Sequence, residues 1–172
     1  ALYSSASICN SAYVSADSAC AAPMLFTNAT CFPVTPVLEL TITSSTSMDF
    51  GAITGGSTNI SSTTFDILNS GNVPATLWFS VSNRGTWIPV ASGAPGFNQV
   101  ELDAQMNFPT SPVSWAAADH ALNTAPPGPD SSSASRFAGN ENGTGVPAGE
   151  TRHLWMRLLA PSSTDQLGQQ RL

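Results

Sequence analysis

The sequence contains little charge, and positive charge is the scarcer of the two signs. Lysine is absent, and the five cationic side chains are all arginines, namely Arg84, Arg136, Arg152, Arg157 and Arg171. So few cations cannot form the basic patch that neutralises nucleic-acid phosphates, which excludes nucleic acid as a partner. Charged residues make up 9% of the chain, against roughly 25% in an average globular domain, and the formal net charge is −6. Self-repulsion between copies is therefore weak, and dense assembly is electrostatically allowed.

Long hydrophobic runs are absent as well. Apolar stretches such as residues 21–26 and 154–160 fall far short of the roughly 20 residues that span a bilayer as a helix. We therefore predict no membrane span. The sequence opens at Ala1 without an initiator methionine or a basic and apolar leader, which suits a mature exported protein. This predicts an extracellular or cell-surface location.

Motifs of enzymes and metalloproteins are also missing. No Gly-x-Ser-x-Gly elbow accompanies the two histidines, His120 and His153, and the glycine-rich residues 51–56 lack the lysine of a phosphate-binding loop. The cysteines form no Cys-x-x-Cys pair, which argues against zinc or haem attachment. Asp119 beside His120 is the one suggestive catalytic pair. We predict that the chain is not an enzyme and that, calcium apart, it binds no cofactor.

Three cysteines are present, Cys9, Cys20 and Cys31, spaced eleven residues apart. In an oxidising compartment, an odd number allows one intrachain bridge and leaves one cysteine free or bonded to another chain. A bridge between Cys9 and Cys20 would close a small loop, and we predict this pair in preference to Cys20 with Cys31.

Three Asn-x-Ser/Thr triplets begin at Asn28, Asn59 and Asn142, in segments typical of turns or strand ends. They predict N-glycosylation at the surface if the cell has the machinery. The alternative is coincidence, because such triplets arise by chance in a chain so rich in Ser, Thr and Asn.

Alternating apolar residues predict short β-strands separated by Gly, Asn, Ser and Pro. The predicted strands cover residues 37–43, 50–53, 63–68, 75–82, 99–106 and 151–159. In the first, Leu38, Leu40 and Ile42 share one face, which predicts a half-buried strand. The other side chains predicted to face the core are Phe65 and Ile67, then Leu77, Phe79 and Val81, then Leu154, Met156 and Leu158. Residues 109–149 are predicted to form an elaborated surface loop.

Two acids, Glu101 and Asp103, alternate onto one face of the predicted strand 99–106. Acids in this position are most often solvated, but they could bind Ca²⁺ if carbonyl groups and a third acid converge there. The oxygen-rich loop 140–143 contains Glu141, which could supply that acid.

The segments 48–57 and 64–81, taken in succession, have a distinctive order. It begins with Met-Asp-Phe-Gly, a short turn and Gly-Ser, and continues with a strand, Asn-Ser-Gly-Asn-Val-Pro and a further strand. This order resembles the Ig-like β-sandwich modules of prokaryotic surface proteins and extracellular filament subunits. The resemblance covers residues 37–172. It implies an all-β fold, an antiparallel Ig-like or jelly-roll-type β-sandwich with an N-terminal extension. We divide the chain accordingly into an arm, residues 1–34, and a sandwich domain, residues 35–172.

The resemblance and the arm together predict a structural subunit of an archaeal or bacterial filament or pilus that polymerises with itself by donor-strand exchange. The chain stops where such sandwiches begin a final strand, which would leave a groove for the arm of the next copy. The residues predicted to take part in assembly are Tyr13, Val14, Met24, Leu25, Phe26, Trp78 and Trp155.

Two other functions compete with this prediction. The first is a secreted carbohydrate-binding or adhesin module that uses tryptophans as flat platforms for glycan rings. Its candidate platforms are Trp78, Trp87, Trp115 and Trp155. The second is a capsid or surface-layer shell protein.

Overall fold

The structure, a computed structural model of the chain, describes residues 6–10, 30–82, 85–90, 93–116, 120–122, 136–166 and 168. These residues form β-strands and connecting loops with almost no helix, so the all-β class predicted from the sequence is confirmed. The chain divides into two compact units, Ala1–Val37 and Leu38–Leu172. Within the part that is described, no helix has the length and apolar character needed to cross a membrane.

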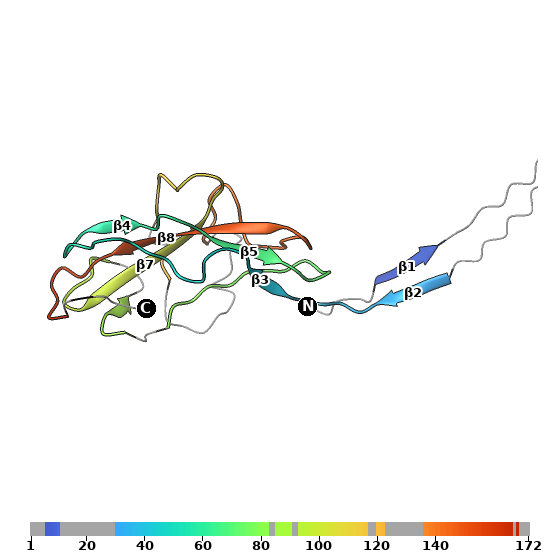
Figure 1. Cartoon of the computed structure of the whole chain (residues 1–172), viewed down its shortest axis with the longest axis horizontal. Coiled ribbons are helices and arrows are strands. Elements are labelled where there is room, and N and C mark those ends of the chain that lie inside the picture. Colours follow the sequence, from blue (N-terminus) through green and yellow to red (C-terminus); the bar gives the residue numbers. More distant parts are fainter. Residues whose placement is uncertain are drawn as a thin grey trace, which may run out of the picture. The chain divides into compact units, whose positions relative to one another are not determined.

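The first unit contains a two-stranded antiparallel sheet, drawn in blue in Figure 1. β1 (Ala6–Asn10) pairs with β2 (Thr30–Val34) in a register that sets Ala6 opposite Val34 and Asn10 opposite Thr30. Several residues of the predicted arm lie outside the described ranges, namely Tyr13, Val14, Cys20, Met24, Leu25, Phe26 and Asn28.

The second unit is built on one six-stranded mixed sheet (Figure 1). Its strands are β3 (Leu40–Ile42), β4 (Thr58–Ile60), β5 (Phe65–Asn69), β6 (Ile88–Val90), β7 (Gln99–Met106) and β8 (Thr151–Leu159). The order along the sheet is β3-β5-β8-β7-β6, and β4 pairs with β8 as well. All neighbouring strands run antiparallel except β6 and β7, which run parallel. In their register Ile88 pairs with Gln99 and Val90 with Glu101. The prediction of a purely antiparallel sheet is therefore wrong at this edge.

The two longest described strands, β7 and β8, agree with the prediction in their bounds. Their alternating apolar residues face one core, in which Val100, Leu102, Leu154 and Leu158 are buried. Burial of each such side chain stabilises the fold by about 1.5–3 kcal/mol. β8 pairs with β7 on one side and with both β4 and β5 on the other, so it joins the two halves of the sheet.

Segments near residues 75–81 and 136–146 pack on this core. Leu77 and Phe137 are buried there, and the rings of Phe79 and Phe137 meet edge to face with centroids 5.4 Å apart. Such aromatic pairs add about 0.5–1.5 kcal/mol beyond their buried area. The predicted inward positions in this segment are therefore confirmed.

The segment 75–82 nevertheless does not form the regular strand that its alternation predicts. Ala75 and Val146 exchange backbone hydrogen bonds of 2.9 and 2.7 Å, but they form an isolated bridge. The facing chain turns at Gly145, whose φ of 62° lies outside the extended region. The two segments therefore do not build a ladder of consecutive pairs.

Among the described strands, β3 lies at one edge of the sheet and pairs with β5 alone. Its predicted inward residues are about half exposed: Leu38 at 61%, Leu40 at 49% and Ile42 at 49%. The prediction of a half-buried strand is wrong because, among the described residues, no segment covers this apolar face as the core is covered at β7 and β8.

Candidate functional site

The face of the central strands opposite the core is polar. Glu101, Asp103 and Gln105 of β7 point to this face, and they are 1%, 0% and 7% exposed. The strand pairing sets Asp103 beside Arg157 and Gln105 beside Trp155 of β8. The alternation of these acids predicts a solvated face, and this prediction is wrong because both faces of β7 are covered.

An ion pair organises this polar face. The Arg157 guanidinium donates from Nε to Asp103 Oδ2 at 2.6 Å and from Nη2 to the same oxygen at 2.5 Å. The guanidinium carbon lies 5.2 Å from the centroid of the Trp115 ring, within the range of a cation–π interaction. Because Asp103 is fully buried, removal of either partner would leave a charge without compensation.

Glu101 lies next to this ion pair. Burial raises the pKa of Glu101 above its ordinary value, and the negative charge of Asp103 raises it further. The Arg157 charge acts in the opposite direction but does not cancel the effect. Oε2 of Glu101 and Oδ1 of Asp103 are buried atoms that have no hydrogen-bond partner among the described residues. A proton held by Glu101 and donated to Asp103 would satisfy one oxygen of each carboxyl group.

The predicted calcium ligands are not brought together. Glu101 and Asp103 are neighbours, but Glu141 accepts a 3.0 Å hydrogen bond from the backbone N–H of His153, at a different place on β8. No group of three or more His, Cys, Asp or Glu side chains in the described ranges could hold a metal ion. The Arg157 cation moreover occupies the position beside Asp103 that a calcium ion would need.

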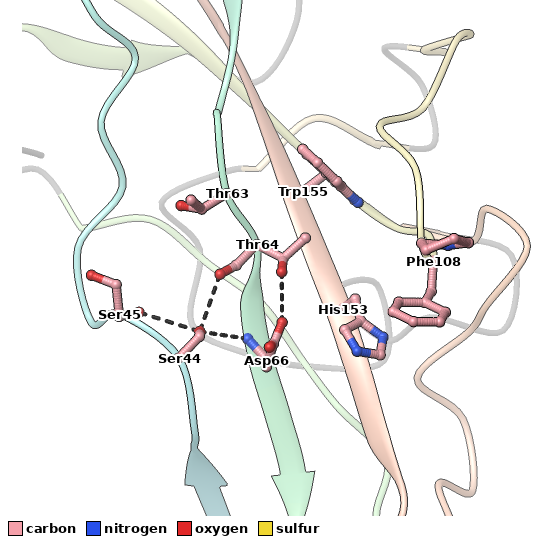
Figure 2. Close-up of a pocket in the computed structure, with 9 residues that line it drawn as sticks. Ser44, Ser45, Thr63, Thr64, Asp66, Phe108, His153 and Trp155 are labelled. Atoms are coloured by element: carbon pink, nitrogen blue, oxygen red, sulfur yellow. Dashed lines mark hydrogen bonds between the residues drawn. The ribbon is translucent and has the colours of Figure 1, made fainter.

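An open groove of about 440 Å³ lies on the same face, between β5, β8 and the chain after β7 (Figure 2). Hydroxyl and carboxylate groups line one side and aromatic rings the other. The lining residues are Ser44, Ser45, Thr63, Thr64, Asp66, Phe108, Pro109, His153 and Trp155.

Hydrogen bonds fix the polar side of the groove (Figure 2). Ser44 Oγ accepts from the Asp66 backbone N–H at 2.8 Å and donates to the Thr64 carbonyl at 3.1 Å. Thr64 Oγ1 donates to Asp66 Oδ1 at 2.6 Å. These bonds tie the chain after β3 to the start of β5, so the polar groups have a fixed arrangement.

The aromatic side of the groove is equally ordered. The Phe108 ring stacks on the His153 imidazole with centroids 4.1 Å apart and an interplanar angle of 29°. Trp155 donates from Nε1 to the Asn107 carbonyl at 2.9 Å, which fixes the indole in the groove. Phe108 is more than half exposed, so its ring is available to a ligand. Fixed rings opposite hydroxyl and carboxylate groups suit a polar ring-shaped ligand such as a sugar.

Neither histidine is paired with a serine or cysteine nucleophile in the contacts of the described residues. His120 is buried, and its Nδ1 accepts from the Ala116 backbone N–H at 3.0 Å, which places its ring proton on Nε2 in the neutral form. His153 contacts Glu141 and Phe108. The absence of enzymatic activity stays a prediction, and Asp119 lies outside the described residues.

The remaining predicted sites differ in accessibility. Asn59 donates from its side-chain amide to the Phe50 carbonyl at 3.0 Å, a bond that a glycan would displace. Asn142 is exposed, and its Oδ1 accepts from the Thr144 backbone N–H at 3.1 Å. Trp78 is 44% exposed, as its predicted outward orientation requires. Glycosylation and assembly at these positions remain predictions.

The open edge at β3 is the feature that sequence reasoning missed. Apolar alternation there predicts burial, yet Leu40 and Ile42 of β3, and Leu38 just before it, are about half exposed, and among the described strands β3 pairs on one side alone. The signal that could have found it is the near absence of charge, since Glu39 is the only charged residue from 38 to 48. Natural sheet edges are commonly protected by charged residues, especially lysine.

Comparisons of the chain with protein-family models, with curated proteins and with solved structures give no match.

Proposed function

We propose that this protein is a structural subunit of an extracellular filament or pilus, joined to its neighbours by strand addition at the edge of β3. The observation that carries the proposal is that no described segment covers the apolar side chains at this edge, namely Leu40 and Ile42 of β3 and Leu38 just before it. An edge strand offers unpaired backbone N–H and C=O groups on one side. An added strand would satisfy these groups and cover the apolar side chains in one step.

The proposed occupant is the arm, residues 1–34, of a second copy. Asp17 is the only charged residue in this arm, so it approaches the nearly uncharged edge without desolvating several charges. The two-stranded sheet of β1 and β2 would be marginally stable by itself in water. Pairing with a neighbouring copy supplies the burial that the hairpin lacks.

The proposal includes the finer fold. We infer an Ig-like or jelly-roll-type sandwich in which the six-stranded sheet is one layer and the segments near 75–81 and 136–146 contribute to the other. Apolar side chains from both sets meet in one core, which is how sandwiches are built. A mature exported protein at the cell surface is the setting in which such a subunit would act.

The test is electron microscopy of the full chain and of three variants under identical conditions. We expect fibres from the full chain, none after deletion of residues 1–34, and none from Leu40→Lys, which places a charge on the open edge. Val113→Lys is the matched control, because Val113 is a fully exposed aliphatic residue away from β3. Fibres from Leu40→Lys, or discrete particles from the full chain, would overturn the proposal.

A second candidate function is glycan binding in the groove of Figure 2. The specific observation in its favour is the exposed Phe108 ring facing ordered hydroxyl groups across the groove. A glycan array followed by calorimetry tests it. Phe108→Ala should abolish binding of any glycan found, whereas Phe97→Ala, which removes another exposed phenyl ring, should not. Equal affinity in both variants would exclude the groove.

A further inference from the structure

The register of the first unit places two cysteines directly opposite each other. In the antiparallel pairing of β1 with β2, Cys9 is the partner of Cys31, between the pairs Ile8 with Phe32 and Asn10 with Thr30. The pairing covers every residue of both strands without a bulge. The position of Cys9 opposite Cys31 therefore follows from the regular backbone pairing of the two strands.

Strand geometry makes this pair suitable for a covalent bridge. Directly opposed residues in an antiparallel ladder have Cα atoms about 4.5 or 5.5 Å apart, according to whether they are a non-hydrogen-bonded or a hydrogen-bonded pair. A disulfide requires a Cα separation of about 4.4–6.8 Å. Both kinds of antiparallel pair fall in this range, so the bridge needs no shift of either strand.

We propose that Cys9 and Cys31 form an intrachain disulfide that locks the register of β1 and β2. The two thiols lose two protons and two electrons to an oxidised dithiol carrier of the exporting compartment, whose own disulfide is reduced to two thiols. This pairing differs from Cys9 with Cys20, the pair that the sequence spacing favoured. It leaves Cys20 as the third, unbridged thiol within the chain.

The bridge explains how a separate two-stranded sheet can persist. Two strands alone bury too little surface to be stable in water. A link between residues 9 and 31 removes much of the conformational freedom of the intervening chain in the unfolded state. The inference rests on the β1 and β2 register alone, so it holds whether or not the chain polymerises.

Peptide mapping of the full-length protein, alkylated without reduction, identifies the pairing. Chymotrypsin cuts after Tyr13 and after Leu25 or Phe26, which puts each cysteine on a separate peptide. We expect the peptide of Cys9 linked to that of Cys31, with Cys20 alkylated. A link from Cys20 to either of the others, or alkylation of all three cysteines, would overturn the proposal. The mass of the Cys31 peptide is searched with and without a glycan on Asn28.

Two controls separate this bridge from its alternatives. A mixture of unlabelled and ¹⁵N-labelled chains, oxidised together, should give linked peptides of uniform label, because a bridge between chains would give mixed labels. Under the same oxidation, Cys20→Ser should show no free thiol and Cys31→Ser should show two. No free thiol in Cys31→Ser, together with a linked Cys9 and Cys20 peptide in the wild-type map, would establish Cys9 with Cys20 and overturn the proposal. Reduction of the wild-type bridge should lower amide exchange protection in β1 and β2 on the order of 100-fold.

Discussion

At Glu101, a single carboxyl group couples folding to pH. Its pKa is raised in the fold by burial and by the Asp103 charge, so ionisation is less favourable in the folded protein than in the unfolded chain. The resulting stability is present in full below the ordinary value of 4.5 and is lost as pH rises through the higher pKa of the folded state. The fold is therefore stabilised by a protonated Glu101.

We predict that Glu101→Gln weakens this pH dependence. An amide occupies the same space, can donate to Asp103 and cannot ionise, so stability should persist as pH rises. Urea unfolding at several values between about pH 4 and pH 8 measures the effect. Glu39→Gln, at an exposed position on the edge-strand segment, is the control and should keep the wild-type profile. A wild-type profile in Glu101→Gln as well would contradict the assignment.

The Arg157 and Asp103 pair gives a second prediction at the residue scale. Asp103→Ala should lower the free energy of unfolding by about 3 kcal/mol, because it leaves the guanidinium largely buried without its counter-charge. Glu150→Ala is the comparison. It removes an ion pair in which Oε2 of the largely exposed Glu150 lies 3.6 Å from Nη1 of Arg152. That change should cost less than about 1 kcal/mol. Chemical denaturation of both variants checks the contrast, and equal losses would contradict it.

At the scale of elements, Asn69 joins the end of β5 to the chain packed over the core. Its buried side-chain amide donates to the carbonyls of Val73 and Val146 at 2.8 and 2.9 Å. Asn69→Ala would leave buried carbonyl groups unsatisfied and should cost about 2–3 kcal/mol. Asn142→Ala, at an exposed loop position, should cost less than about 1 kcal/mol. Thermal unfolding distinguishes the two, and an equally mild Asn69→Ala would show that this link is dispensable.

β7 and β8 show what alternation can predict. Both are long, both alternate regularly, and their bounds and core-facing residues follow from the sequence. Alternation identifies one apolar face but carries no information about what covers the other. The buried Glu101 and Asp103 therefore escaped prediction, because their cover comes from tertiary contacts. β3 fails for the converse reason: its alternation is clear, but its place at an edge is set by strand order.

The groove of Figure 2 could not be predicted from sequence at all. Its residues come from four separate stretches of the chain, near residues 44, 64, 108 and 154, and no motif connects them. Trp155 is predicted to face away from the core on its strand, and it does line the groove. Phe108 and Asp66 carry no such signal. Asp66 becomes a neighbour of His153 through the pairing of β5 with β8, and Phe108 reaches the groove because β7, which it follows, pairs with β8 on the other side.

At the scale of the whole molecule, scarcity of charge determines how assembly should respond to salt. Backbone hydrogen bonds and apolar contacts at the β3 edge would supply the association energy, while charged pairs contribute little in a chain with 9% charged residues. Salt screens attraction between exposed charges over about 10 Å at 0.1 M. The critical concentration for fibre formation should thus change less than about twofold between roughly 50 and 300 mM NaCl, measured by sedimentation. A strong rise with salt would mean that ion pairs hold the copies together. The open apolar edge would then be incidental, and the interface would have to be sought among the exposed acids and the few arginines.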